Sequence, residues 1–367
     1  MYLENISLRH FKNYLQCDLE FSQYINCIMG SNGSGKTNLL DAIHYLSLTK
    51  SSLNPIDQQN IQHDKEFFSI RGTFNLHGKN HQIQCSCKIG SRKVIQKNKK
   101  PYTRLSEHIG AFPLVLISPY DTDILREGSM TRRKFMDGII SQIDPQYLRN
   151  LLKYQRLLSQ RNQLLKNFAL KHQYDAQLIA SYDEPMLQLM KLIFDRRNQF
   201  MDQYVPLFKK HYNSLSEGRE EVDLNYKSDL FAADFLEKFQ NNHQRDLTLQ
   251  RTDLGTHKDD LSCRVGGYSI SKFGSQGQQK SFVIALKLAQ FELIQKEKEF
   301  KPILLIDDIF DKLDDKRIEQ LIDMVSGQTF GQLFITDARP ERTARILGNV
   351  PCEISKFMID NGKVAAI

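Results

Sequence analysis

A glycine-rich stretch constrains the fold of this chain more than any other part of the sequence. It fits the pattern glycine, four residues, glycine, lysine, then serine or threonine, and consists of Gly30, Ser31, Asn32, Gly33, Ser34, Gly35, Lys36 and Thr37. An apolar run precedes this P-loop, and residues 38–46 after it carry apolar side chains at helical spacing. This order of strand, loop and helix predicts a phosphate-binding site, because glycines let backbone N–H groups curl toward an anion at the helix N-terminus. The alternative is a glycine turn before a core helix.

The P-loop predicts a nucleoside triphosphate, ATP, and a magnesium ion as ligands. We expect Lys36 to reach the β- and γ-phosphates and Thr37 to ligate the metal. The apolar run 302–306 predicts a buried strand beside the P-loop strand, and this run ends in Asp307 and Asp308. We expect Asp307 to hold Mg²⁺ opposite Thr37, and Asp308 to accept a proton from the attacking water. Lys36 and Asp308 are therefore the candidate catalytic residues. The alternative is an acidic turn that closes a strand.

The charge balance permits a polyanionic partner such as DNA without requiring one. The chain carries 50 Lys and Arg residues against 43 Asp and Glu residues, which gives a formal charge of +7 and a pI of about 8.9. No run approaches the roughly 18 apolar residues of a membrane span. Residues 1–15 lack a signal-peptide profile, so we expect a cytoplasmic protein without membrane contact. The cysteines lack paired zinc spacing and are predicted to be free thiols: Cys17, Cys27, Cys85, Cys87, Cys263 and Cys352.

Strand-like and helical segments follow each other in a pattern that predicts an α/β fold with a helical insertion. Apolar patterns predict strands over residues 2–9, 15–21, 67–76, 82–89 and 113–117. Residues 129–212 then show almost no strand pattern. Further strands are predicted at 222–226, 261–265, 302–306 and 332–336, and helices at 276–295 and 314–324. We therefore predict one α/β domain formed by residues 1–120 and 220–367, interrupted by a mostly helical lobe at 121–219.

A second short motif opens the helix predicted over residues 276–295. It resembles the signature motif of ABC-type ATPases, usually serine-glycine-glycine-glutamine, and its four positions are Ser275, Gln276, Gly277 and Gln278. The resemblance implies an ABC-type ATPase head, in which this helix N-terminus offers a serine hydroxyl and a glycine amide to a phosphate. In that family the motif completes the nucleotide site of a partner subunit. ATP would therefore hold a two-fold dimer together, and hydrolysis would release it.

Other positions follow the ABC pattern only in part. Gln276 stands where the signature usually has glycine. Leu313 and Asp314 follow the acidic strand at the offset of the D-loop. Thr336 and Asp337 end the next apolar run, where these ATPases usually place a switch histidine. The role of Asp337 as a γ-phosphate sensor is therefore left open.

Spacing distinguishes the chain from most ABC-type ATPases. The gap between P-loop and signature is longer than in a transporter cassette, and it lacks the sustained heptads of a Rad50-type or chromosome-maintenance ATPase. This size and order resemble the bacterial RecF family of DNA replication and repair ATPases. The strings that carry the resemblance are residues 8–14, 119–121 with 128–137, 255–261 and 306–314. The departures from the family pattern lie outside the phosphate-binding core and are Met130, Thr256, Lys258 and Lys312.

The resemblance implies ATP-dependent homodimerisation, binding to gapped DNA and to single-strand/double-strand junctions, and slow DNA-stimulated ATP hydrolysis that serves mainly as a nucleotide switch. It also implies work with RecR and RecO to load RecA onto single strands, and a part in the SOS response. It places Lys12 and Asn13, from the first string, among the nucleotide-binding residues. The alternatives are a Rad50-like DNA tether, a transport motor cassette and a nucleotide-binding scaffold.

A basic cluster between residues 92 and 104 is the candidate DNA contact. Tyr102 lies within it, and aromatic side chains among basic ones suit nucleic acid. The alternative is a solvated sheet edge that its lysines protect from pairing with other strands. The basic cluster consists of Arg92, Lys93, Lys97, Lys99, Lys100 and Arg104.

Overall fold

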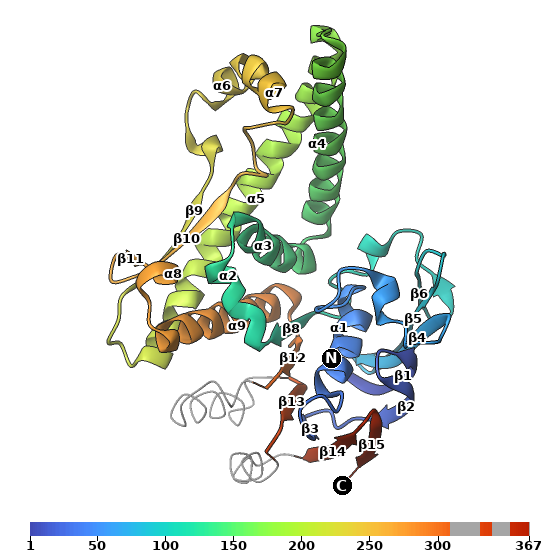
Figure 1. The fold of residues 1–367 in the computed structure, drawn as a ribbon. Coiled ribbons are helices and arrows are strands. Elements are labelled where there is room, and N and C mark those ends of the chain that lie inside the picture. The colour runs from blue at the N-terminus through green and yellow to red at the C-terminus, as the bar shows by residue number, and fades with distance from the viewer. Residues whose placement is uncertain (309–330, 340–352, 367) are drawn as a thin grey trace. The chain divides into compact units, whose positions relative to one another are not determined.

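The chain folds into two compact units. The first consists of Met1–Thr122 and Lys280–Ile367, and the second of Asp123–Gln279. The computed structural model describes residues 1–308, 331–339 and 353–366, and Figure 1 draws the chain as a ribbon. Helix α9 (Gln276–Lys298) begins in the second unit and continues into the first.

The first unit contains two six-stranded sheets. One is antiparallel, in the order β2 (Tyr14–Glu20), β1 (Tyr2–Phe11), β4 (Phe67–Leu76), β5 (Lys79–Lys88), β6 (Val94–Lys97) and β7 (Lys100–Pro101). The other runs in the order β15 (Lys363–Ala366), β14 (Ile354–Asp360), β3 (Ile25–Met29), β13 (Leu333–Asp337), β12 (Ile303–Ile306) and β8 (Leu114–Ile117). Its strands pair in parallel except for β15, which is antiparallel to β14. The predicted α/β class is confirmed.

Helix α1 (Lys36–Leu48) lies at the centre of this unit. It contacts β1, β4 and β5 of the antiparallel sheet and β8 and β13 of the other sheet. Leu39, Ile43 and Leu46 are fully buried in the common core. Each such side chain contributes about 1.5–3 kcal/mol through burial. The helix that starts at the P-loop is therefore fixed by both sheets.

The acidic strand does not lie directly beside the P-loop strand, and that prediction is wrong. β13 lies between them, with Leu333 opposite Ile25 of β3 on one side and opposite Leu304 of β12 on the other. β3, β12 and β13 are all buried and mostly apolar, so their composition does not fix their order. Because the three strands are parallel, their carboxyl ends still reach the same edge of the sheet.

The second unit is mostly helical, as predicted for residues 129–212. Its main helices are α3 (Ser129–Ile143), α4 (Pro145–Lys171) and α5 (Ala176–Ser216). Asp144 caps α4 just before Pro145, which occupies the first turn. The shorter elements are α2 (Asp123–Arg126), β9 (Val222–Lys227), α6 (Phe235–Asn241), α7 (His243–Leu249), β10 (Asp260–Val265), β11 (Tyr268–Ser269) and α8 (Ile270–Phe273).

The helical lobe was expected to end at residue 219, whereas the second unit continues to Gln279. The difference has a physical cause in the pairing of strands. β9 pairs with β10 in the sheet β11-β10-β9, and β9 also packs against α5. Residues 220–279 therefore belong to the second unit, where β9 and β10 pair with each other and β9 packs against α5.

Two of the strings that carry the family resemblance meet around a buried arginine of this unit. Arg197, from α5, bonds to Asp137 of one string at 2.9 Å and to Asp259 of the other at 2.5 Å. Arg132 and Asp260 add an ion pair at 2.6 Å between the same strings. Removal of one partner from a buried pair costs about 3–5 kcal/mol. These strings therefore hold the second unit together.

The cysteines that the structure describes form no disulfide bond. They are Cys17, Cys27, Cys85, Cys87 and Cys263, and Cys352 lies outside the described residues. Within the ranges that the structure describes, no helix is long and apolar enough to cross a membrane.

Candidate nucleotide-binding site

The P-loop connects β3 to α1 and needs glycine at two positions. At Gly35, φ is 122° and an added Cβ would lie 2.5 Å from Asn13 Nδ2. At Gly30, an added Cβ would lie 2.3 Å from the carbonyl oxygen of Ile359. Gly35 is also the N-cap residue of α1 and has no side chain that could cap it. The helix N-terminus therefore suits an anion.

Lys36 and Ser34 present polar groups to the interior of the loop. Lys36 Nζ donates to the carbonyl oxygens of Gly30 at 2.8 Å and Ser31 at 3.0 Å. Ser34 Oγ is buried and has no hydrogen-bond partner among the described residues. An unpaired buried group of this kind costs about 1–3 kcal/mol. A phosphate oxygen that accepted from both side chains would satisfy Ser34 and neutralise the lysine.

Asp307, at the end of β12, connects the acidic strand to the P-loop. Its Oδ1 accepts hydrogen bonds from Thr37 Oγ1 at 3.1 Å and Thr336 Oγ1 at 2.8 Å. Burial raises the pKa of the Asp307 carboxyl above its ordinary value, and the two hydroxyl groups oppose this rise only in part. A buried carboxylate in this position gains from a cation beside it. The structure thus brings Thr37 and Asp307 together, and their predicted binding of a magnesium ion stays a prediction.

Asp308 follows directly and adopts a left-handed backbone conformation with a φ of 45°. Its backbone N–H donates to Thr336 Oγ1 at 2.8 Å, which fixes the turn at the strand end. Its Oδ1 is buried and has no hydrogen-bond partner in the described part of the chain. This oxygen has the acceptor capacity that a general base requires.

These residues fit a magnesium ion that arrives with a triphosphate. Across residues 1–308, 331–339 and 353–366, no group of three or more His, Cys, Asp or Glu side chains could hold a metal ion. Mg²⁺ is commonly bound by one or two protein groups and completes its shell with water and phosphate oxygens. Thr37 and Asp307 are such a pair, and the unpaired Ser34 hydroxyl lies in the adjoining loop.

Asn13 supports the P-loop from the turn between β1 and β2. Its Nδ2 donates to the carbonyl oxygen of Ser34 at 2.9 Å, and its Oδ1 accepts from Asn38 of α1 at 2.8 Å. Tyr14 adds a bond from its hydroxyl to the carbonyl oxygen of Gly35 at 2.9 Å. Asn13, predicted to bind nucleotide, therefore lies against the loop backbone.

Lys12, the other residue of the first string that was predicted to bind nucleotide, forms an ion pair with the P-loop helix α1. Its Nζ lies 2.6 Å from Asp41 Oδ2 of α1, and the two side chains are 8% and 0% exposed. Although burial alone would raise the pKa of the Asp41 carboxyl, the Lys12 ammonium helps to lower it below its ordinary value. The structure thus places Lys12 in a buried ion pair with the P-loop helix.

The hairpin of β14 and β15 also contacts the P-loop, which sequence reasoning missed. The backbone N–H of Gly362 donates to the carbonyl oxygen of Ser34 at 3.1 Å. Asn361 and Gly362 have φ values of 47° and 77°, as a tight hairpin turn requires. The Asn-Gly pair was a signal for the hairpin, but the sequence held no signal for where the hairpin packs.

The signature motif lies in the second unit at the start of α9 and forms a capping box. The backbone N–H of Ser275 donates to Gln278 Oε1 at 2.8 Å, and the backbone N–H of Gln278 donates to Ser275 Oγ at 3.2 Å. Ser275 and Gln276 are exposed, and Gly277 is half-buried. The participation of these residues in a nucleotide site stays a prediction.

The remaining ABC-type positions are described only in part. Asp337, at the switch position, is buried at the end of β13, and its Oδ1 accepts from the backbone N–H of Arg339 at 3.1 Å. Leu313, Asp314 and Lys312 lie outside the described residues, as does the helix predicted over 314–324.

The basic cluster forms the outer edge of the antiparallel sheet, at β6 and β7. Lys93 is engaged, since its Nζ lies 2.9 Å from Asp57 and donates to the carbonyl oxygen of Thr49 at 2.6 Å. Lys97 lies over the Phe112 ring, 5.5 Å from its centroid. The exposed members of the cluster are Arg92, Lys99, Lys100 and Arg104. The edge position agrees with the expected sheet edge and leaves four cations in solvent.

Replacement of Asp307 by asparagine is expected to stabilise the metal-free protein while abolishing magnesium-dependent ATP binding. Because its carboxyl pKa is raised, the folded protein holds the Asp307 proton more tightly than the unfolded chain does. This adds to the free energy of unfolding in full below the ordinary pKa of 3.8, and the addition is lost as the pH rises through the native pKa. At neutral pH the wild type therefore carries a cost that asparagine removes, and asparagine Oδ1 can still accept from both threonines. We expect the melting temperature to rise by about 1–3 °C at pH 8 and by less at pH 5.

Thermal unfolding without magnesium, at both pH values, checks this prediction. Asp360→Asn is a matched control, because Asp360 is exposed at the end of β14. An Asp307→Asn protein that melts below the wild type at pH 8 would contradict the predicted sign.

The comparisons with known proteins agree over nearly the whole chain. The family model described as the RecF/RecN/SMC N terminal domain matches residues 2–355. The DNA replication and repair protein RecF of Flavobacterium johnsoniae is 49% identical, covering 95% of this chain and 97% of the relative. The protein of the same name from Cytophaga hutchinsonii is 46% identical, covering 99% and 96%.

Solved structures give the same answer for the fold. A structure of the recombination mediator protein RecF with ATP, in the RecFOR pathway, matches with a TM-score of 0.89 at 30% identity, covering 100% of this chain and 97% of that one. An Smc head bound to the C-winged helix domain of ScpA matches with a TM-score of 0.58 at 16% identity and supports the fold alone. The chain therefore belongs to the RecF family of DNA replication and repair proteins, with the fold of an ABC-type ATPase head.

Proposed function

We propose that this chain is an ATP-driven, DNA-binding switch in recombinational repair and replication restart. The observation that carries the proposal is the meeting of Lys36, Thr37 and Asp307 at one sheet edge. Asp308 follows directly, and its Oδ1 has no hydrogen-bond partner among the described residues. The relative that was solved with ATP, at 30% identity over the whole chain, supports ATP as the nucleotide.

Each residue of the site has a distinct role in this proposal. The backbone amides of residues 30–35 and the Lys36 ammonium bind the phosphates. Thr37 and Asp307 hold Mg²⁺, which would neutralise charge that develops on the transferred phosphoryl group. Asp308 accepts the proton of the attacking water.

The signature motif supplies the second half of the site in a partner copy. We assign the ATPase head to the first unit and the signature to the second. Ser275 is exposed at a helix N-terminus, as a group that reaches another subunit's phosphate must be. ATP then binds the dimer more tightly than the monomer, and hydrolysis releases the two copies.

DNA and the mediator proteins are the proposed partners. The charge of +7 supports a polyanionic ligand, and the name of the relatives, DNA replication and repair protein, supports DNA. We propose gapped duplexes and single-strand/double-strand junctions as the forms of DNA that are bound. The RecFOR pathway of the solved relative supports RecR and RecO as partners. RecA loading and a cytoplasmic location complete the proposal.

Size-exclusion chromatography with light scattering, in apo, ADP and ATP samples, tests the switch. We expect a dimer only with ATP, and faster ATP turnover when a gapped duplex is added. A monomer under all three conditions would refute the dimer switch. ATP turnover that does not change when DNA is added would refute the proposed stimulation by DNA.

The basic cluster is tested by charge reversal of its exposed residues. Lys99→Glu, Lys100→Glu and Arg104→Glu together should weaken DNA binding and flatten its dependence on salt, because each lost phosphate contact lowers the salt slope by roughly one. Lys93→Glu is unsuitable, since Lys93 pairs with Asp57. An unchanged salt titration would remove the cluster from the DNA site and leave it as a protected sheet edge.

A further inference from the structure

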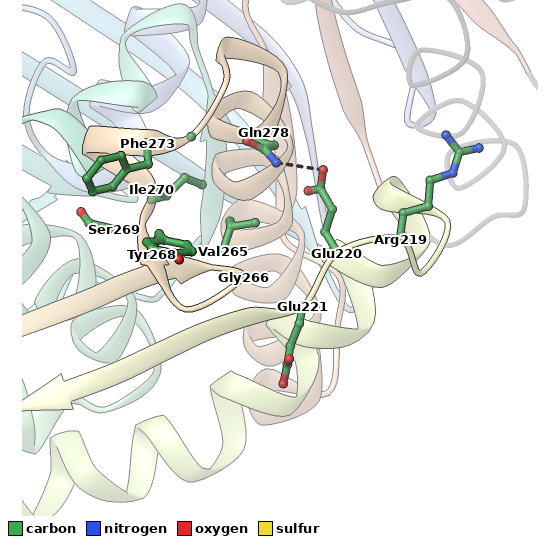
Figure 2. Close-up of a pocket in the computed structure, with 11 residues that line it drawn as sticks. Arg219, Glu220, Glu221, Val265, Gly266, Tyr268, Ser269, Ile270, Phe273 and Gln278 are labelled. Atoms are coloured by element: carbon green, nitrogen blue, oxygen red, sulfur yellow. Dashed lines mark hydrogen bonds between the residues drawn. The ribbon is translucent and has the colours of Figure 1, made fainter.

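The capping box of the signature motif has an unusual outer contact. Gln278 uses its Oε1 to accept from the Ser275 backbone at 2.8 Å, and its Nε2 donates to Glu220 Oε1 at 3.0 Å. Figure 2 shows the Glu220 carboxylate pointing at the Gln278 amide. One amide group therefore connects the signature serine to a residue 58 positions earlier in the chain.

The Glu220 contact fixes which end of the Gln278 amide faces the serine. An ionised carboxylate only accepts hydrogen bonds, so the NH₂ end of the amide must face Glu220. The oxygen end then faces the Ser275 N–H, as the capping box requires. Without the carboxylate, the amide is free to rotate and to donate from its NH₂ group to another acceptor.

Glu220 is itself held by the end of a long helix. Its second carboxylate oxygen, Oε2, accepts a hydrogen bond from the hydroxyl of Tyr212, a fully buried residue of α5. The 41-residue helix α5 ends at Ser216, four positions before Glu220. The two oxygens of this carboxylate thus join the end of α5 to the start of α9.

The Gln278 side-chain amide lies at the edge of a pocket. Glu220 and Gln278 line a pocket of about 380 Å³, whose lining also includes Tyr268 and Phe273. These two aromatic side chains are 68% and 72% exposed, and Phe273 lies two residues before the signature serine. The amide therefore borders open space, and polar contacts rather than dense packing set its orientation.

We propose that Glu220 is a positioning residue for the signature motif. It fixes the amide of Gln278, which holds Ser275 in the conformation that completes the nucleotide site of a second copy, and through Tyr212 it ties that conformation to α5. This inference rests on the proposed ATP-dependent dimer.

Glu220→Ala tests the proposal, with Glu221→Ala as the matched control. Glu221 lines the same pocket, but its side chain points away from Gln278 in Figure 2. We expect Glu220→Ala to weaken the ATP-dependent dimer about tenfold for each of its two sites, as for loss of a hydrogen bond to a charged group. ATP binding to the monomer should stay unchanged, because the P-loop does not involve Glu220. Glu220→Gln retains an acceptor and should restore part of the affinity.

Hydrogen exchange of the Ser275 amide separates this inference from the proposed function. Loss of its bond to Gln278 should raise the exchange rate about tenfold in Glu220→Ala and leave it unchanged in Glu221→Ala. Equal exchange in the two variants, or an ATP-dependent dimer that forms with equal affinity in both, would overturn the positioning role. A third result is that the wild type fails to dimerise with ATP while Glu220→Ala still differs from Glu221→Ala in Ser275 exchange. That result would refute the dimer and support the positioning of Ser275 by Glu220.

Discussion

Replacement of Lys36 by alanine is expected to abolish ATP binding and ATP-dependent dimerisation together. Lys36 Nζ donates to two carbonyl oxygens of the P-loop, and we propose that it binds the phosphates of a nucleotide there. A hydrogen bond to a charged group contributes about 1.5–3 kcal/mol, so the loss of two such bonds should weaken binding at least a hundredfold. A plain monomeric P-loop enzyme would lose turnover without any change in its oligomeric state.

The variant should still fold, which makes the test specific. Alanine is a favourable residue at the first position of α1, and the buried face of that helix is unchanged. Lys191→Ala, an exposed site on α5, is a suitable control. Nucleotide affinity and mass in solution, measured with ATP, check the prediction. A Lys36→Ala protein that still dimerises with ATP would show that the dimer does not depend on this site.

The amino-acid sequence could predict those parts of the site that lie close together along the chain. The P-loop is one continuous stretch, and its glycines, lysine and threonine each have a role fixed by local geometry. Asp307 could be found because a buried apolar strand that ends in two carboxylates is a strong signal. The Thr37–Asp307 contact followed from combining two such local signals.

Other parts depended on packing that no local pattern encodes. The position of β13 between β3 and β12 depends on competition among equally apolar strands. The ion pair of Lys12 with the buried Asp41 of α1 had no signal in the sequence, and a nucleotide-binding role of Lys12 stays a prediction. The contact of Gly362 with Ser34 joins segments more than three hundred residues apart. Each of these arrangements removes groups from water, and the free energy of that burial depends on neighbours that are distant in sequence.

Asp308→Asn is expected to trap the ATP-bound dimer by removing the general base. The Asp308 carboxylate has an unpaired, buried oxygen, and the side chain follows the proposed metal ligand Asp307 directly. Loss of general-base catalysis lowers turnover by about 10²–10⁴-fold. In the proposed site, Lys36, Thr37 and Asp307 bind the phosphates and the metal, so the ATP affinity should be retained. The dimer should then persist for much longer after excess ATP is removed.

Asparagine is the appropriate substitution because of the backbone at this position. Asp308 has a φ of 45°, a left-handed conformation that asparagine tolerates better than alanine does. The backbone N–H can also keep its bond to Thr336 Oγ1. Asp308→Ala would combine loss of the base with backbone strain, so a slow alanine variant alone would not identify the base.

Single-turnover hydrolysis and dimer lifetime together decide the role of Asp308. Slow hydrolysis with a long-lived dimer assigns the base and makes hydrolysis the step that releases the two copies. Wild-type turnover in Asp308→Asn would reject Asp308 as the base. Slow hydrolysis with a dimer that dissociates at the wild-type rate would separate ATP hydrolysis from dimer dissociation. Dissociation would then follow from nucleotide exchange, and the Asp308 carboxylate would act only in the hydrolysis step.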